Sequence, residues 1–418
     1  MNPATATYLP DTYRFSWPEE GVEILVDRIM EVKTDLHCEM TVRTALPFPG
    51  LLRQAKINLS STRTRSEWVR ALTERGVEVD WYAAIEQACT LAIRHWREGS
   101  PFIDLSLVEP SEDDAYLLRP YIVEGAASGI FADGGTGKSL WALAAALSVA
   151  TGQPVIGPTP SRVCPVLYLD WEWDEDAHAE RLQALCRGVG IETPTPGLIW
   201  YRREQASINE TAPSIRRFII EQRIGLVIID SLGFARGGEP ESAELTIKTF
   251  TSFRTFGVPV LFVDHVSKHA TDKQHSFGSV YTRNSARLMW RMDADDQEGA
   301  TKRIGLINTK WNRRYQKPRG LMLITESDPA DRLASVIFED CDPPLATIRA
   351  GGLKDAAAAI LRQNTEGLSI DDLRMVMEAE GVKTTKNVLA ATLSKKSNRE
   401  IFYPREGKWY VGSTINVN

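Results

Sequence analysis

FADGGTGKSL, residues 131–140, is the stretch that decides the fold of this chain. It follows an apolar run at 125–131, precedes a helical pattern at 140–150, and carries the tripeptide GKS at 137–139. The general phosphate-loop pattern is GxxxxGK[ST], and this sequence matches it except that Ala132 replaces the first glycine. A strand, a glycine-rich turn and a helix in this order predict a loop that binds a nucleotide phosphate.

Each part of the predicted loop has its own role in binding Mg-ATP. Backbone N–H groups wrap the β-phosphate at the helix N-terminus, Lys138 reaches the β and γ oxygens, and the Ser139 hydroxyl is a ligand of Mg²⁺. The sequence therefore predicts ATP and Mg²⁺ as cofactors. The predicted nucleotide-binding residues are Gly134, Gly135, Thr136, Gly137, Lys138 and Ser139.

The composition is that of an ordinary globular protein with more than one domain. The chain has 418 residues, of which 43% are apolar and 25% charged, and a net charge of -6. Any nucleic-acid contact must therefore come from local basic patches. Five dispersed cysteines without a CxxC pair argue against a disulfide framework or a zinc site. Without a leader pattern or an apolar run of ~18 residues, we expect a cytoplasmic protein and no membrane span.

The hydrophobic pattern divides the chain into three predicted domains. Alternating segments and two helical runs predict a small α+β domain over 1–109, with a scaffold or oligomerisation role. Over 110–345, apolar strands alternate with amphipathic stretches, which predicts an α/β core with a mostly parallel sheet. The last strands of that core are separated only by turns and should form an antiparallel extension. The third domain covers 346–418.

Two carboxylates are expected beside the phosphate loop. The strand GLVIID ends in Asp230, where a carboxylate can lie behind Mg²⁺, although an aspartate at a strand end is also a common turn cap. The segment VLYLDWEWDED offers Asp170, Glu172 and Asp174 as acceptors that orient the attacking water. Only the residue just past the strand end reaches the γ-phosphate region, so we predict Glu172 as the catalytic base.

The ordered motifs resemble the RecA-type ATPase core. They are the phosphate loop, a strand ending in D-x-E, the segment VIIDS, and a strand ending in VDHVSK. Within this class the chain is most similar to the hexameric replicative helicases of the DnaB and plasmid RepA kind, with their phage and mobile-element relatives. The resemblance covers about 117–340. It implies ATP hydrolysis between the subunits of a homo-oligomeric, hexameric ring, with Glu172 activating water.

The same resemblance assigns roles to two further segments. His265, together with Asp264, would lie near the γ-phosphate as the sensor at the end of a strand. NTKWNRRYQKPRG resembles the K-x-[RN] segment with which one subunit reaches the γ-phosphate held by its neighbour. The candidates for this trans finger are Lys310 and Arg313 or Arg314. A solvated basic hairpin turn is the alternative interpretation of that segment.

Two loops would face the central channel of such a ring and hold single-stranded DNA. By alignment they are 234–241 and 267–278. The second contains Lys268 and Lys273 among small residues and few acids, a composition that suits contacts to the DNA backbone. The alternative interpretation is that each segment is a solvated loop that does not contact DNA.

The C-terminal segment resembles a winged helix-turn-helix. A capping box at 369–372 opens the second of three predicted helices, and a hairpin turning at Glu406-Gly407 follows them. Residues 383–399 contain no acidic side chain, which suits a helix that enters a groove of duplex DNA. Docking of a protein partner is the alternative. The predicted DNA-contacting residues are Lys383, Lys386, Lys395, Lys396, Arg405 and Lys408.

Together these patterns predict a cytoplasmic, DNA-associated ring or filament that hydrolyses Mg-ATP. We expect a helicase-like motor of DNA replication or recombination. One alternative is a regulatory or signalling ATPase whose nucleotide state controls the docking of a protein partner. The other is a DNA-binding switch that holds ATP without useful turnover, against which the complete set of site residues argues.

Overall fold

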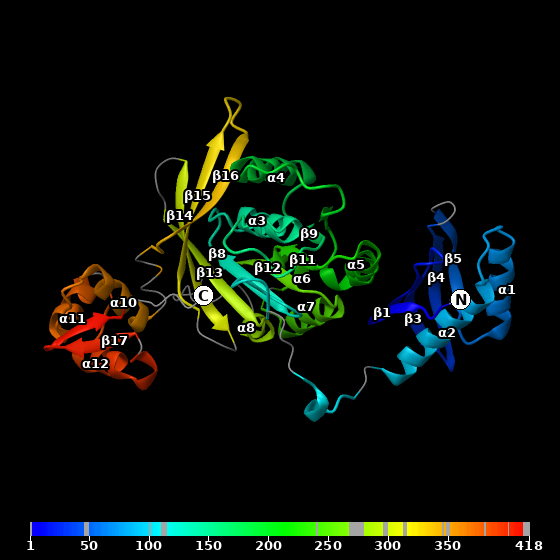
Figure 1. The fold of residues 1–418 in the computed structure, drawn as a ribbon, viewed down its shortest axis with the longest axis horizontal. Helices are drawn as coiled ribbons and strands as arrows, with labels where there is room; N and C mark the ends of the chain where they lie inside the picture. Colours follow the sequence, from blue (N-terminus) through cyan, green and yellow to red (C-terminus); the bar gives the residue numbers. More distant parts are fainter. Residues whose placement is uncertain are drawn as a thin grey trace. The chain divides into compact units, whose positions relative to one another are not determined.

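The computed structural model divides the chain into two compact units. One comprises Met1–Asp114, Ala206–Gly225 and Lys248–Val258, and the other comprises Ala115–Gln205, Leu226–Ile247 and Pro259–Asn418. Both are drawn in Figure 1. The residues that the structure describes are 2–45, 50–99, 102–109, 115–239, 241–266, 280–295, 300–311, 316–344, 347, 352–379, 382–399 and 401–412.

The first unit is built on an antiparallel sheet with two helices. Its strands lie in the order of the sequence and are β1 (Thr5–Leu9), β2 (Thr12–Trp17), β3 (Val22–Val32), β4 (Asp35–Thr44) and β5 (Gly50–Asn58). Helices α1 (Thr62–Thr73) and α2 (Trp81–Glu98) pack against each other, and the short 3-10 helix η1 spans Leu105–Leu107. Ser61 and Asp80 cap the two helices by accepting backbone N–H groups. Trp17, Trp68 and Trp81 are fully buried in the shared core.

Helix α5 (Ile208–Gln222) belongs to this first unit, although it connects two strands of the other unit along the chain. It packs against β2, and two arginines bind carboxylates of the N-terminal sheet. Arg216 lies 2.7 Å from Asp11 and Arg217 lies 2.9 Å from Asp27. Ion pairs between partly buried side chains are less screened by solvent than surface pairs, and these two join α5 to the β1–β2 turn and to β3.

The second unit contains a nine-stranded, mostly parallel sheet. Its order is β10-β9-β11-β12-β8-β13-β14-β15-β16. Strands β10 to β13 in this order pair in parallel, and β13 to β16 pair antiparallel. The predicted α/β core with an antiparallel extension is therefore confirmed. The strands are β8 (Ala127–Ala132), β9 (Val166–Asp170), β10 (Ile199–Arg203), β11 (Leu226–Asp230), β12 (Val260–His265), β13 (Leu288–Asp295), β14 (Thr301–Trp311), β15 (Arg319–Ser327) and β16 (Leu333–Cys341).

The central strands and the helix behind the phosphate loop are almost wholly buried. All residues of β9 and β11 are buried, which is the pattern of parallel strands covered on both faces. Helix α3 is buried nearly all round, from Trp141 to Ala150. The remaining elements of the second unit are β6 (Tyr116–Leu118), β7 (Ile122–Val123), α3 (Lys138–Thr151), α4 (Glu175–Val189), α6 (Leu232–Arg236) and α8 (Val280–Ser285). Helix α7 (Ala243–Thr255) begins in the second unit, and its residues from Lys248 onward belong to the first.

The C-terminal residues have a small core of their own. Helix α11 begins with the predicted capping box, in which Ser369 Oγ accepts the N–H of Asp372 at 3.1 Å. Leu373, Leu389 and Phe402 are fully buried between the helices and a two-stranded hairpin. The elements are α10 (Leu353–Gln363), α11 (Ile370–Ala379), α12 (Lys386–Ser394), η2 (Lys396–Asn398), β17 (Phe402–Arg405) and β18 (Lys408–Val411).

Helix α4 lies against β16, as Figure 1 shows, and Gly188 is the point of closest approach. A Cβ atom on Gly188 would lie 2.0 Å from the carbonyl oxygen of Val336. Backbone cannot move aside as a flexible side chain can. We therefore expect Gly188→Ala to lower the free energy of unfolding by about 1–3 kcal/mol, measured by urea denaturation.

Gly233 in α6 provides the matched control, because nothing lies within 4 Å of a Cβ placed there. Gly233→Ala should leave stability unchanged or raise it by up to ~1 kcal/mol, since alanine favours helix more than glycine does. Equal stability of the Gly188→Ala and wild-type proteins would contradict the described packing of α4.

Candidate nucleotide-binding site

The phosphate loop joins β8 to α3 and has the backbone geometry that its glycines permit. Gly135 and Gly137 have φ of 75° and 92°, a region that favours glycine. Ala132 is the last residue of β8, is fully buried, and is not among the residues with positive φ. Alanine therefore fits the first motif position without strain, which explains this departure from the pattern.

Lys138 lies at the start of α3 with its ammonium group over the loop. Its Nζ donates to the carbonyl oxygens of Ala132 and Asp133 at 3.1 and 2.7 Å. Burial lowers the pKa of Lys138, while Asp230 and Glu172 act in the opposite direction. A buried ammonium group at a helix N-terminus, beside backbone N–H groups, is suited to binding phosphate.

Asp230 lies at the end of β11, beside the first turn of α3. Only 3% of the residue is exposed, and burial raises the pKa of its carboxyl group. Hydrogen bonds from Tyr168 and Ser139 oppose this rise. A buried carboxylate next to a hydroxyl group fits Mg²⁺, which takes oxygen ligands and commonly uses one or two protein ligands with phosphate oxygens. Ser139 and Asp230 are thus the residues able to hold the metal.

The three acidic candidates at and after the end of β9 have separate positions. Asp170 Oδ1 accepts the backbone N–H of Glu172 at 2.7 Å, and Asp174 caps the N-terminus of α4. Glu172 Oε1 accepts the hydroxyl of Ser231 at 2.6 Å and lies 3.4 Å from His265 Nε2. The bond to His265 is the largest influence lowering the pKa of Glu172, so its carboxylate is ionised at neutral pH. An ionised carboxylate in this place can accept a proton.

The end of β12 places two further groups beside Glu172. His265 is half-exposed, and its backbone N–H donates to Asp264 Oδ1 at 2.9 Å. Asp264 is fully buried, and burial raises its pKa to about 6 against the opposing effect of Arg236. Arg236 NH1 also donates to Thr246 at 3.2 Å. The strand end therefore places the half-exposed His265 next to the buried Asp264, whose charge is opposed by Arg236.

Two side chains at this site were not predicted from the sequence. Tyr168 in β9 donates its hydroxyl to Asp230 Oδ2 at 2.6 Å. Lys302 in β14 donates to the carbonyl oxygen of Gly135 at 2.8 Å. The only sequence signal for Tyr168 is that it precedes Asp170 by two and so shares its strand face. Lys302 comes from the antiparallel extension and had no signal at all.

Lys310, predicted as part of a trans finger, is engaged within its own chain. Its Nζ donates to the carbonyl oxygens of Arg283, Asn284 and Ala286 at 2.6, 3.0 and 2.6 Å. These are the free carbonyl groups at the end of α8, which a cation satisfies well. The predicted finger residue Arg313 and the predicted loop lysines Lys268 and Lys273 lie outside the described residues.

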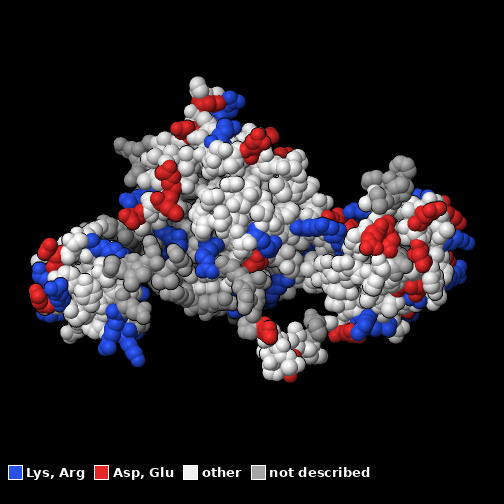
Figure 2. All heavy atoms as spheres, viewed as in Figure 1, with Lys and Arg blue, Asp and Glu red and all other residues white. Residues whose placement is uncertain are grey.

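The predicted DNA-contacting residues of the C-terminal part are all exposed, but several have partners in the chain. Lys386 pairs with Asp371 at 2.6 Å, and Lys408 donates to the carbonyl of Glu366 at 3.3 Å. Arg405 lies 3.7 Å from Glu406. Figure 2 shows both basic and acidic side chains on the visible face of this part. The ammonium groups of Lys383, Lys395 and Lys396 make no ion pair with a described residue.

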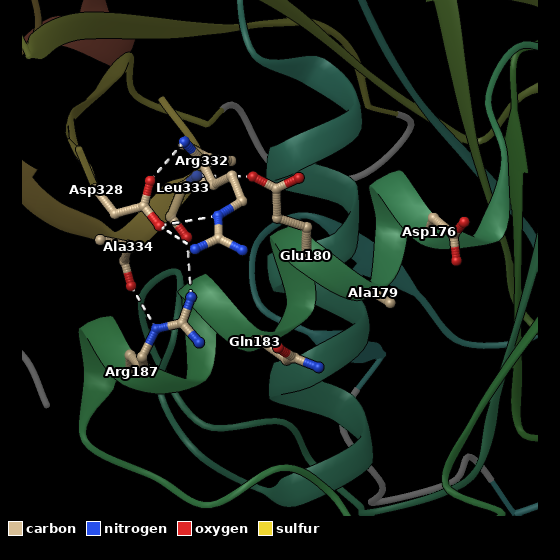
Figure 3. A pocket seen from close by; sticks show the side chains of 9 residues that line it. All are labelled: Asp176, Ala179, Glu180, Gln183, Arg187, Asp328, Arg332, Leu333 and Ala334. Carbon is tan, nitrogen blue, oxygen red and sulfur yellow. Dashed lines mark hydrogen bonds and ion pairs between the residues drawn. The ribbon is translucent and has the colours of Figure 1, made fainter. Parts of the chain in front are cut away.

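A pocket of about 550 Å³ lies between α4 and the β15–β16 hairpin, away from the phosphate loop. Figure 3 shows Arg332 turned toward Asp328, at 2.7 Å, and Arg187 directed at the backbone of Leu333 and Ala334. Glu180 Oε1 accepts the N–H of Leu333 at 2.7 Å. These bonds anchor the hairpin to α4. They involve none of the groups around Lys138.

Two further features were sought in the described part of the chain: a cluster of metal-binding side chains and a membrane-spanning helix. There, no group of three or more histidine, cysteine, aspartate or glutamate side chains is placed to hold a metal ion. Likewise, no helix of those residues combines the length and apolarity needed to cross a bilayer.

Comparison with known proteins supports a nucleotide-hydrolysing domain. Residues 99–271 match a family model described as an AAA domain, and this segment includes the phosphate loop, Glu172, Asp230 and His265. Among solved structures, a KaiC-like protein from the hyperthermophilic archaeon Pyrococcus horikoshii is 14% identical, with a TM-score of 0.37. The match covers 56% of this chain and 99% of that one. No curated protein sequence matches the chain. The matched segment contains the phosphate loop of the mostly parallel sheet, and this match supports a nucleotide-hydrolysing activity.

Proposed function

We propose that the protein is a DNA-associated ring or filament ATPase of the DnaB and plasmid RepA branch. It acts as a helicase-like motor in replication or recombination and works in the cytoplasm. The observation that carries the proposal is the meeting of Glu172, Asp230 and His265 with Lys138 at one edge of the sheet. This set of groups suits phosphoryl transfer to water.

Each residue of the site has a role in the proposed reaction. The backbone N–H groups of 134–139 and the ammonium of Lys138 bind the phosphates, while Ser139 and Asp230 hold Mg²⁺. When bound, the metal neutralises charge that develops on the β- and γ-phosphate oxygens. Glu172 orients the attacking water and accepts its proton, and its ionised state suits that task. His265 and Ser231 fix the Glu172 carboxylate by hydrogen bonding.

We further propose that the active protein is a hexamer, in which one subunit completes the site of the next. Lys310 anchors the end of β14 to α8, and Arg313 beyond it is the finger that reaches the neighbouring γ-phosphate. Exposed apolar side chains in the first unit support assembly. Phe102, Leu105 and Leu107 are exposed, and apolar groups that cluster at a surface commonly mark contacts between proteins.

A mixing experiment tests the shared site. Arg313→Ala keeps its own phosphate loop but loses the finger, whereas Lys138→Ala loses its loop but keeps the finger. We expect each variant alone to lose at least ~10³-fold in ATP turnover, in line with the contribution of arginine fingers. Mixed subunits should regain activity, because some interfaces then pair an intact loop with an intact finger.

Arg314→Ala, mixed in the same way, is the matched control. It should turn over ATP as the wild type does if Arg313 is the finger. Wild-type turnover of Arg313→Ala, or an inactive mixture, would contradict the shared site.

We propose that the C-terminal residues form a winged helix that contacts duplex DNA through α12, η2 and the β17–β18 hairpin. The exposed ammonium groups of Lys395 and Lys396 support this proposal. We expect the double variant Lys395→Ala/Lys396→Ala to bind a short duplex more weakly. The slope of log K, the logarithm of the binding constant, against the logarithm of the salt concentration should fall in magnitude by about two. Fluorescence anisotropy at several salt concentrations measures both quantities.

Arg374→Ala is the control for this surface, because Arg374 lies on the acidic helix α11 and pairs with Glu378 at 2.7 Å. It should leave the affinity and its salt dependence unchanged. Unaltered DNA binding by the lysine variant would favour protein docking at this surface instead.

The effect of DNA on ATP turnover distinguishes the proposed motor from a regulatory ATPase. The ion pair between Lys386 and Asp371 favours the regulatory alternative, since it offsets one positive charge of the C-terminal surface. We expect single-stranded DNA to raise steady-state Mg-ATP hydrolysis several-fold, with Lys138→Ala inactive under both conditions. Turnover that is indifferent to DNA would contradict the motor and leave an ATPase that controls a protein partner.

A further inference from the structure

Tyr168 is a buried polar side chain between the two proposed metal ligands. It lies in the middle of β9 and is 1% exposed. Its hydroxyl oxygen is 2.6 Å from Asp230 Oδ2 and 3.4 Å from the backbone oxygen of Ser139. The Ser139 side chain also hydrogen-bonds the Asp230 carboxylate. One tyrosine hydroxyl therefore contacts both residues that are placed to hold Mg²⁺.

The ring of Tyr168 is held so that its hydroxyl has little freedom. Its centroid lies 4.8 Å from that of His178 in α4 and 6.5 Å from that of Tyr201 in β10. His178 is in turn bound by the buried carboxylate of Asp170, two residues after Tyr168 on the same strand face. Packing on two sides and a bonded neighbour fix the direction in which the hydroxyl points.

We propose that Tyr168 is a positioning residue that orients the Asp230 carboxylate for Mg²⁺. The inference rests on the proposed ATPase function and adds a residue to its metal site. A tyrosine hydroxyl keeps its proton near neutral pH and donates it to one carboxylate oxygen. That bond prevents rotation of the carboxylate. Hydrogen bonds to metal-ligating carboxylates commonly contribute about 10–100-fold to metal affinity.

The placement also explains why one strand serves two functions. Tyr168 reaches the metal ligand, and Asp170 holds the backbone N–H of Glu172 at 2.7 Å. The metal site and the water-activating carboxylate are therefore aligned by neighbouring positions of β9. Loss of the Tyr168 hydroxyl should disturb the metal site without disturbing the Glu172 carboxylate.

The test uses Tyr168→Phe, which removes the hydroxyl and keeps the ring. Tyr201→Phe is the matched control, because the Tyr201 hydroxyl donates to the Trp173 carbonyl at 2.8 Å and contacts no proposed metal ligand. The probe is a fluorescent, non-hydrolysable ATP analogue, bound to the full chain in EDTA and then titrated with Mg²⁺. Direct binding of Mn²⁺ to the nucleotide complex, followed by electron paramagnetic resonance, gives a second readout that does not depend on turnover.

Mg²⁺ is expected to raise the affinity for the ATP analogue. We expect Tyr168→Phe to need an Mg²⁺ concentration about 10-fold higher than the wild type to reach half of that increase. Its affinity in EDTA and its melting temperature should match the wild type, and Tyr201→Phe should match it in every respect. An unchanged Mg²⁺ midpoint would overturn the inference. A loss of affinity for the ATP analogue that is as large in EDTA as in Mg²⁺ would also overturn it, since the hydroxyl would then shape the phosphate loop. If the wild type itself binds no nucleotide, the proposed function fails as a whole.

Discussion

The structure of the site depends on one constraint: parallel strands in register bring buried carboxylates to the same edge of the sheet. Asp170 and Asp230 are direct neighbours in the β9–β11 pairing, and His265 pairs with Ala132, which begins the phosphate loop. Asp170, Asp230 and Asp264 are all buried there. Isolated buried anions are costly, and crowding them together adds repulsion.

Each of these three aspartates has its own compensating partner. Asp170 is bound to His178, Asp230 accepts the Tyr168 hydroxyl, and the charge of Asp264 is opposed by Arg236. Lys138 supplies a shared positive charge over the loop. The arrangement keeps Glu172 as the partly exposed, ionised carboxylate that is accessible to water. A divalent cation bound beside the phosphate loop would offset part of the negative charge that gathers there.

The antiparallel extension is part of this site as well as an edge of the sheet. Lys302 of β14 holds the carbonyl of Gly135, and a side chain on Gly137 would lie 3.3 Å from Leu323 of β15. The hairpin that follows β15 is bonded to α4 through Arg187 and Glu180. Strands far along the chain thus support the loop that the opening motif encodes. This support limits the movement of the Gly135 carbonyl.

Local sequence patterns were sufficient for the phosphate loop and for the alternation of strands and helices, because these depend on spacing. They also favoured Glu172 over Asp170 and Asp174 as the base, since the end of β9 could be located from its apolar run, and this assignment stays a prediction. Tyr168 and Lys302 were not predictable, because their roles depend on which strands become neighbours. The same limit applies to Lys310, whose partners are carbonyl groups at the end of α8.

The central claim is that Glu172 activates water while other groups bind the nucleotide. The most direct measurement compares ATP binding with phosphate release in a single turnover of Glu172→Gln. This variant should bind ATP with wild-type affinity and release phosphate at least about 10²-fold more slowly, the usual contribution of a general base. Phosphate release at the wild-type rate would contradict the claim, as would loss of ATP binding.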